Sequence, residues 1–165
     1  MPLRILGALA LIAAGSVAAY AYASALRQKL TRIDALLEAL DFIRTQIDQL
    51  RTPLPQIIAA LAAREGMIGE LFAPVQTQIE ADERVGTALV SMSAQFDDRQ
   101  IHDTFLSLAA ALGRYEADEQ VLQIRYTISR IAARREELYT ARRQKAPLVY
   151  RIGVSAGLCM AILLL

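Results

Sequence analysis

The side chains that could carry acid–base, metal or nucleophilic chemistry are few, and their spacing does not suit it. His102 is the only histidine and Cys159 the only cysteine, so a four-ligand zinc site would lack nitrogen and sulfur donors. The adjacent acids of Asp97-Asp98 and of Glu136-Glu137 point about 100° apart on a helix, so neither pair faces one substrate as catalytic carboxylates do. The sequence therefore predicts no catalytic residue, no metal and no cofactor, and it predicts that His102 lies at a helix start or on the surface.

Binding of nucleic acids or of a small-molecule substrate is not indicated either. The sequence has no glycine-rich loop that could cradle a phosphate. Acids number 17 and basic residues 18, and in the middle of the chain the two signs are interleaved, which argues against a nucleic-acid face. All the acids lie between Asp34 and Glu137. The two ends of the chain are thus chemically different from the middle.

One charge pattern has a regular spacing. Acids at helical intervals form an acidic stripe on the first predicted helix, and two arginines share a face of the last one; these residues are Asp34, Glu38, Asp41 and Asp48, and Arg130 and Arg134. A first interpretation is two solvated faces held by local pairs such as Asp41/Arg44 and Asp48/Arg51. A second is an interhelical ladder that fixes register, with Asp41 opposite Arg134. A third is a docking stripe for a basic partner.

A junction between two helices is indicated by LGRYEADEQ, residues 112–120. Gly113 can take the left-handed conformation that closes a helix. Three acids then place negative charge on the first turn of the next helix, where unpaired amides and the helix dipole favour it; they are Glu116, Asp118 and Glu119. The stretch is therefore predicted to be the corner of a helix hairpin.

The elements that position these residues are all predicted to be helices. Apolar residues recur every three or four positions from Leu26 to Leu50, so the first helix is expected to run without a break to about Arg51. Thr52-Pro53 then supplies a capping hydroxyl and an N1 proline for a short helix. That helix is expected to end near Gly66, in the C′ position.

Further helices follow from the same periodicity. One covers residues 67–79, and Pro74 either kinks it or lies in the first turn of a later start. Val85–Phe96 forms another. Asp97-Asp98 caps the next, whose apolar face is Ile101, Phe105, Leu108 and Leu112. The last helix is expected to lie antiparallel to the first, which makes the middle of the chain an antiparallel helical bundle.

Both ends of the chain are long and apolar enough to cross a membrane. Ile5–Leu26 contains 22 uncharged residues, and about 20 helical residues span the hydrocarbon core. At the other end Pro147 is expected to interrupt the last bundle helix at about Ala146. Ala146–Leu165 then carries only Arg151, which can snorkel to the headgroups. The predicted organisation is an all-α bundle between two transmembrane helices, with boundaries 1–26, 27–145 and 146–165.

The flanking charges indicate an orientation. Basic residues lie on the bundle side of both apolar segments, so the bundle is expected to be cytoplasmic; they are Arg27, Lys29 and Arg32, and Arg142, Arg143, Lys145 and Arg151. An alternative remains open, because the apolar run after Arg4 and the AYAYASA stretch at 19–25 also fit a cleavable secretion signal. Gly153 and Gly157 are spaced as G-x-x-x-G, which permits close helix pairing and hence self-association.

Several features together resemble one protein family. They are the TPLP turn at 52–55, the LG-R-x-x-x-x-x-Q junction of Leu112, Gly113, Arg114 and Gln120, and the final RIGVSAGLCMAILLL segment. In this order and spacing they resemble the stage III sporulation protein AB family, whose soluble part is similar to the F domain of type II secretion and type IV pilus platform proteins. Tyr115 departs from the family pattern, which has a small hydroxyl residue after Gly-Arg, so the hairpin corner is expected to be looser.

The resemblance implies a function without chemistry. It implies a subunit of the mother-cell membrane complex that, with a secretion-type ATPase and other membrane subunits, forms a channel toward the forespore during engulfment. In that role the bundle is a platform or adaptor that docks the ATPase or neighbouring subunits. Two alternatives remain open: a general type II secretion or type IV pilus platform component, which normally carries two such domains, and an exported, membrane-tethered helical binding module.

Overall fold

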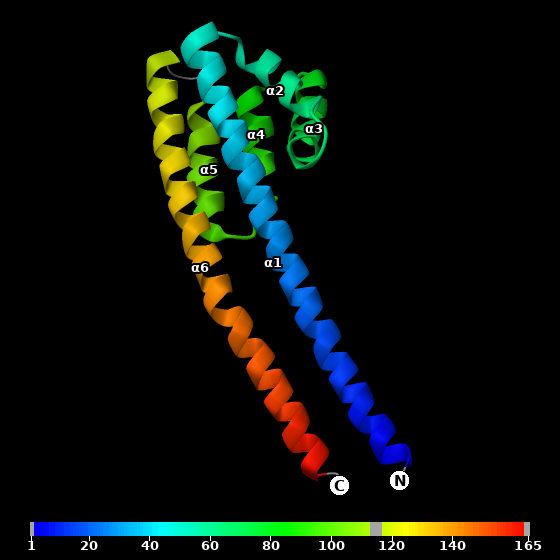
Figure 1. The fold of residues 1–165 in the computed structure, drawn as a ribbon. Coiled ribbons are helices and arrows are strands. Elements are labelled where there is room, and N and C mark those ends of the chain that lie inside the picture. Colours follow the sequence, from blue (N-terminus) through cyan, green and yellow to red (C-terminus); the bar gives the residue numbers. More distant parts are fainter. Residues whose placement is uncertain (1, 113–116, 164–165) are drawn as a thin grey trace. The chain divides into compact units, whose positions relative to one another are not determined.

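The polypeptide is helical in the computed structural model, which describes residues 2–112 and 117–163 (Figure 1). The helices are α1 (Pro2–Leu50), α2 (Leu54–Ala62), α3 (Met67–Glu80), α4 (Val85–Ser93), α5 (Arg99–Ala111) and α6 (Ala117–Leu163). Over these residues the predicted all-α fold class is confirmed. The unbroken first helix is also confirmed, since α1 ends at Leu50, one residue before the expected end.

The chain divides into two compact units. Residues 29–136, which we call the helical unit, comprise the second part of α1, all of α2 to α5 and the first part of α6. Residues 1–28 and 137–165 form the other unit. Over the described residues, no helix combines the length and the apolar character that a membrane crossing needs.

Pro147 lies inside α6, so the predicted interruption of the last helix is wrong. A proline in a helix removes one backbone donor and crowds the preceding turn, at about 3 kcal/mol. The prediction assumed that this cost is large enough to end the helix at the proline. In a helix of 47 residues, the turns on either side of the proline keep their own hydrogen bonds, and the helix continues through it.

The core of the helical unit takes apolar side chains from every helix. The largest fully buried ones are Leu36, Leu40 and Ile43 of α1, Ile57, Ile58 and Leu61 of α2, Leu71 and Phe72 of α3, Leu89 and Met92 of α4, and Ile101 and Phe105 of α5. From α6, Ile124 and Ile131 are buried as well. The predicted apolar face of α5 is confirmed, because none of its four members is more than 4% exposed. Each such side chain stabilises the fold by about 1.5–3 kcal/mol.

The turn between α1 and α2 differs from the prediction in the role of its hydroxyl. Pro53 is the N-cap residue of α2 and makes no side-chain capping bond. Thr52 instead donates its Oγ1 hydroxyl to Gln46 Oε1 (3.0 Å) and its backbone N–H to the Gln46 carbonyl (3.1 Å). Thr52 therefore closes the end of α1, because its backbone N–H binds one of the last carbonyls of that helix. Its hydroxyl binds the Gln46 side chain and does not cap α2.

In the next turn, between α2 and α3, the glycine has a different role from the predicted one. α2 ends at Ala62, with Ala63 as its C-cap, and Gly66 is the N-cap residue of α3 with φ 80°. The positive φ that favours glycine is present, but it opens the next helix and does not close the previous one. Pro74 lies in the interior of α3, which settles the choice that the sequence left open.

Candidate functional site

Ion pairs join α1 and α6 within the helical unit. Asp34 accepts from Arg135 Nε, Asp48 Oδ2 lies 3.8 Å from Arg125 Nη2, and Arg51 Nη2 lies 2.9 Å from Asp118 Oδ1. As residue numbers rise along α1, those of the partners fall along α6, so within the helical unit the two helices lie side by side and antiparallel. The antiparallel arrangement predicted for the first and last helices is confirmed within the helical unit, and the three pairs form an interhelical ladder.

The predicted rung between Asp41 and Arg134 is wrong. Asp41 pairs within its own helix with Arg44 (2.7 Å), as the local interpretation expected. Arg134 reaches Asp98 at the start of α5. The local pair Asp48/Arg51 is also wrong, because both residues pair with α6 instead.

Glu38, the remaining acid of the predicted stripe, holds the turn between α2 and α3. Its Oε1 lies 3.2 Å from Arg64 Nη1. The Arg64 guanidinium carbon also lies 4.3 Å from the ring centroid of Phe42, in a cation–π contact. One arginine therefore ties this turn to two positions on α1. Each of the four acids of the stripe thus has a partner within the chain.

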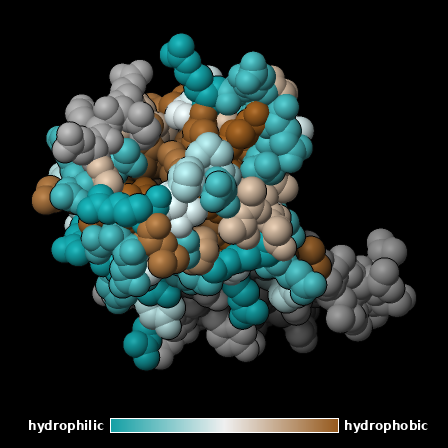
Figure 2. Space-filling view, turned by 90° about the horizontal axis from the view of Figure 1, so that it is seen from above, coloured by the Kyte–Doolittle hydropathy of each residue, from teal (hydrophilic) through white to brown (hydrophobic). Residues whose placement is uncertain are grey.

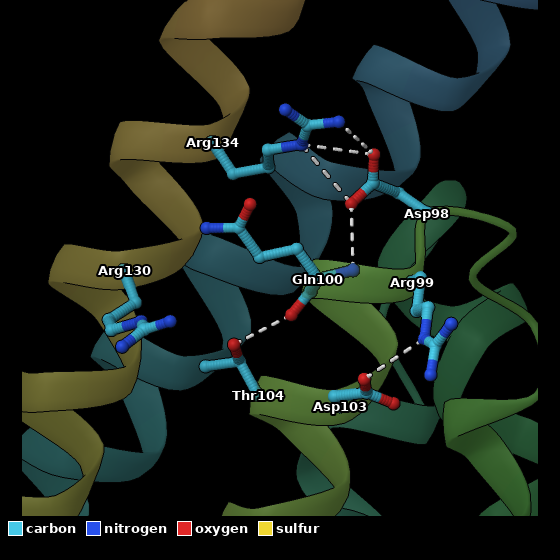
Figure 3. Close-up of a pocket in the computed structure, with 7 residues that line it drawn as sticks. All are labelled: Asp98, Arg99, Gln100, Asp103, Thr104, Arg130 and Arg134. Atoms are coloured by element: carbon cyan, nitrogen blue, oxygen red, sulfur yellow. Dashed lines mark hydrogen bonds and ion pairs between the residues drawn. The ribbon is translucent and has the colours of Figure 1, made fainter.

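The most elaborate polar contact centres on Asp98, between α5 and α6 (Figure 3). Asp98 is the N-cap residue of α5, and its Oδ1 accepts from the backbone N–H groups of Gln100 (3.1 Å) and Ile101 (3.2 Å). Its Oδ2 accepts from Arg134 Nε (3.1 Å) and Nη2 (3.0 Å). The two side chains are 20% and 31% exposed. The predicted cap is confirmed, and one carboxylate both starts α5 and binds it to α6.

The pairing of Asp98 with Arg134 had no sequence signal, because 36 residues separate the partners. The same is true of Lys29, whose Nζ lies 3.0 Å from Asp97 Oδ2. The Asp97-Asp98 dipeptide thus contacts α1 through one residue and α6 through the next. A capping pattern identifies Asp98 in a sequence, but it carries no information on which distant cation lies opposite.

The surroundings of Asp98 stabilise its charged form. Burial raises the pKa of Asp98, but the hydrogen bond from Arg134, the backbone N–H of Ile101 and the charge of Arg134 lower it by more. The pKa of Asp98 therefore lies below its ordinary value of 3.8. A carboxylate that stays ionised and paired at neutral pH acts as a structural anchor and not as a general acid.

The lowered pKa of Asp98 predicts how stability depends on pH. Because the pKa is lower in the folded state, the contribution of the charge is fully present above the unfolded value, about 3.9, and is lost as pH falls through the folded value. Asp98→Asn keeps a capping side chain and removes the charge. We expect wild type to be more stable than this variant by about 1.5 kcal/mol at pH 6. Chemical unfolding curves should show this gap shrinking below about pH 4, and a gap that is constant down to pH 2 would contradict the assignment.

A polar pocket of about 430 Å³ surrounds this contact. Figure 3 shows its lining residues, Asp98, Arg99, Gln100, Asp103, Thr104, Arg130 and Arg134. Most of their polar groups bind one another: Arg99 Nε lies 3.7 Å from Asp103 Oδ2, and Thr104 donates to the Gln100 carbonyl (2.6 Å). Arg130 donates to the hydroxyl of Tyr126 (3.0 Å). The arrangement is suited to holding helices in place.

His102 bridges two helices of the same region. Its Nδ1 lies 3.0 Å from Asp103 Oδ1, and its Nε2 lies 3.3 Å from the hydroxyl of Ser93, which is buried on α4. The side chain is 34% exposed, so its position near the helix start matches the prediction. Within the described residues, no group of three or more histidine, cysteine or acidic side chains is placed to hold a metal.

The junction motif lies partly outside the described residues. Leu112 is the C-cap residue of α5 and is 4% exposed, so it belongs to the core. Gly113 and Arg114 fall in the stretch 113–116, which the structure does not describe. Gln120 is half-buried in the first turns of α6. Asp118 and Glu119 occupy the first turn of α6, as the charge pattern predicts.

Comparison with known proteins identifies the family of the chain. No curated protein and no solved structure is significantly similar to it. The family model described as stage III sporulation protein AB matches residues 4–165. That span contains the TPLP turn, the junction motif and the final apolar segment, on which the resemblance of the sequence rests. The chain therefore belongs to the stage III sporulation protein AB family and is a sporulation protein.

Proposed function

We propose that this protein is a non-enzymatic, membrane-anchored subunit of a secretion-like channel complex of sporulation. Its helical unit acts as a platform or adaptor that docks a secretion-type ATPase or neighbouring membrane subunits. The observation that supports this most is the family match over residues 4–165, because it includes both apolar segments as well as the helical unit. The expected location is the mother-cell membrane that faces the forespore.

The anchoring part of the proposal is supported by the sequence of the two ends. Ile5–Leu26 contains no charge and Ala146–Leu165 contains only Arg151. About 20 apolar helical residues match the thickness of the hydrocarbon core, and α1 and α6 are the helices that carry these segments. The basic residues beside each segment favour the cytoplasmic side for the helical unit.

Carbonate extraction and proteolysis test the anchors and the orientation. We expect the full-length protein to stay with the membrane fraction in alkaline carbonate, because apolar segments buried in lipid are not released by high pH. Protease added outside intact cells should leave the helical unit uncut. Release by carbonate, or digestion from outside, would contradict the anchored cytoplasmic topology. A mature N-terminus near Ser24 would show that the first segment is a cleaved signal.

A candidate docking surface lies where α1 ends and α6 begins. The ion pair between Arg51 and Asp118 holds these two helix ends together. Leu50 precedes Arg51, and Leu122 follows Asp118 by about one helical turn; the two leucines are 64% and 69% exposed. Figure 2, which views the top of Figure 1, shows apolar residues among polar ones at this end of the helical unit. Exposed apolar side chains with a charged rim are typical of protein contact sites.

Copurification tests the docking role. We expect the full-length protein, extracted in mild detergent, to retain the ATPase or a neighbouring subunit. The double variant L50S/L122S should retain at least about tenfold less, because the loss of interface anchors costs more than about 1.4 kcal/mol. Tyr139→Ser is the control, since Tyr139 is also exposed (44%) on α6 but lies outside the helical unit.

The outcomes of this experiment distinguish an error in the proposed function from an error in the proposed docking surface. If the wild-type protein retains no member of a sporulation complex, the proposed function is overturned. If the wild type retains its partner and L50S/L122S does so equally well, the partner binds elsewhere on the helical unit. Loss of binding in Tyr139→Ser as well would indicate a general effect of removing apolar surface.

A further inference from the structure

Charge is segregated along the chain. All 17 acids and ten of the 18 basic residues lie between Asp34 and Glu137, so this stretch has an excess of acids. The other eight basic residues flank it without any acid. Six of these eight form two clusters directly beside the apolar segments, which we call the basic collar: Arg27, Lys29 and Arg32 on α1, and Arg142, Arg143 and Lys145 on α6.

On α1, the collar residues are exposed on more than one side of the helix. Arg27, Lys29 and Arg32 are exposed, whereas the neighbouring Leu30 and Ile33 are buried, at 7% and 3%. At about 100° per residue, Lys29 and Arg32 lie roughly 60° apart around the helix, whereas Arg27 lies roughly 140–160° away from both. Lys29 contacts Asp97 and still leaves 54% of its side chain exposed. A layer of anions around the helix therefore fits this cluster better than a partner on a single face.

α6 repeats the arrangement before the second apolar segment. Arg142, Arg143 and Lys145 occupy three of four consecutive positions in α6. Arg143 is exposed. No acid follows Glu137 in the sequence, so this helix carries only positive charge from there to its end.

We propose that the basic collar binds the anionic headgroups of phospholipids in the leaflet next to the helical unit. The inference rests on the proposed membrane anchoring, because the collar meets a headgroup layer only if the apolar segments lie in the bilayer. An anionic leaflet attracts lysine and arginine within about one Debye length, and the same potential repels acids. The stretch from Asp34 to Glu137, with its excess of acids, is therefore not drawn to the surface, and the attraction is confined to the collar.

The sequence contains no tryptophan, so a single introduced tryptophan can report contact with lipid through its fluorescence. Tyr20→Trp places it in the first apolar segment, where Tyr20 is 78% exposed, about 10 Å along the helix from Arg27. The full-length protein is reconstituted into vesicles of phosphatidylcholine and phosphatidylglycerol, with one or the other lipid brominated on its acyl chains. The ratio of fluorescence quenching by the two lipids gives their relative association constant at the protein surface.

We expect phosphatidylglycerol to associate at least about fivefold more strongly than phosphatidylcholine, since one basic residue near an anionic surface contributes about that factor. The preference should fall several-fold in the variant R27Q/R32Q/R143Q, which removes three of the six collar charges and keeps Lys29 and its contact with Asp97. It should also weaken as the salt concentration rises to about 0.5 M.

A matched control removes the same charge from the helical unit. The variant R84Q/R99Q/R125Q replaces three exposed arginines outside the collar, and it should keep the lipid preference of the wild type. Equal quenching by both lipids, or an equal loss in the collar and control variants, would overturn the lipid inference and leave the anchoring intact. Quenching by neither lipid would place the reporter outside the bilayer and overturn the proposed anchoring itself.

Discussion

Replacement of Gly69 by alanine is expected to destabilise the helical unit by about 3 kcal/mol. A Cβ at this position would lie 1.9 Å from the Arg64 carbonyl oxygen and 3.1 Å from its carbon. Both are backbone atoms, so no side-chain rotation relieves the clash. The same turn also contacts α1, through the ion pair of Arg64 with Glu38 and its cation–π contact with Phe42. Unfolding in urea, followed by far-ultraviolet circular dichroism of the detergent-solubilised full-length protein, should show a large fall in the midpoint.

Gly66→Ala is the matched control in the same turn. A Cβ there would meet nothing within 4 Å, and only the positive φ of 80° opposes the substitution. With ψ at −155°, Gly66 has a backbone conformation that essentially only glycine adopts, so the expected cost is about 1–3 kcal/mol from backbone strain alone. A Gly69→Ala variant that is as stable as the wild type would show that α3 does not approach the turn as closely as described.

The sequence predicts those features of the fold that depend on a local pattern, such as the regular spacing of apolar residues. The apolar face of α5 recurs every three or four residues, and all of its members are buried. Asp98 precedes that run and caps it. The corners are less predictable, because the same residue type suits two neighbouring roles. Gly66 fits either the end of α2 or the start of α3, and Thr52 can bond backward to α1 as well as forward to α2.

The sequence predicts that acids of the first helix pair with arginines of the last, but it does not predict which residues pair. Two acids of α1, Asp34 and Asp48, do pair with arginines of α6. A shift of one residue, however, turns a helical side chain by about 100°. Arg135 therefore faces Asp34 of α1, while the adjacent Arg134 faces Asp98 of α5. Distances counted along each helix from the apolar segments give an approximate depth. They do not give the rotation of the helix, which is set by packing of apolar residues such as Ile124 and Ile131.

Asp98→Ala is expected to lower the stability of the helical unit by about 2–3 kcal/mol. The substitution removes the cap of α5, which contributes about 1 kcal/mol, and leaves the half-buried guanidinium of Arg134 without this carboxylate. Asp98→Asn should cost only about 1.5 kcal/mol, because an asparagine still caps the helix. Urea midpoints of the two variants, measured at the same pH and salt concentration, give the order of the effects.

The neighbouring Asp97 supplies the control for this prediction, since it also pairs across the domain but is 71% exposed. Exposed ion pairs contribute little after solvent screening, so Asp97→Asn should change stability by only a few tenths of a kcal/mol. A double-mutant cycle of Asp98→Asn with Arg134→Gln isolates the interaction from the other contacts of Arg134, and a coupling of about 1–2 kcal/mol is expected. Coupling near zero would mean that Asp98 acts through its cap alone. In that case the attachment of α5 to α6 would rest on the apolar core, and Asp98→Ala would cost no more than a lost N-cap.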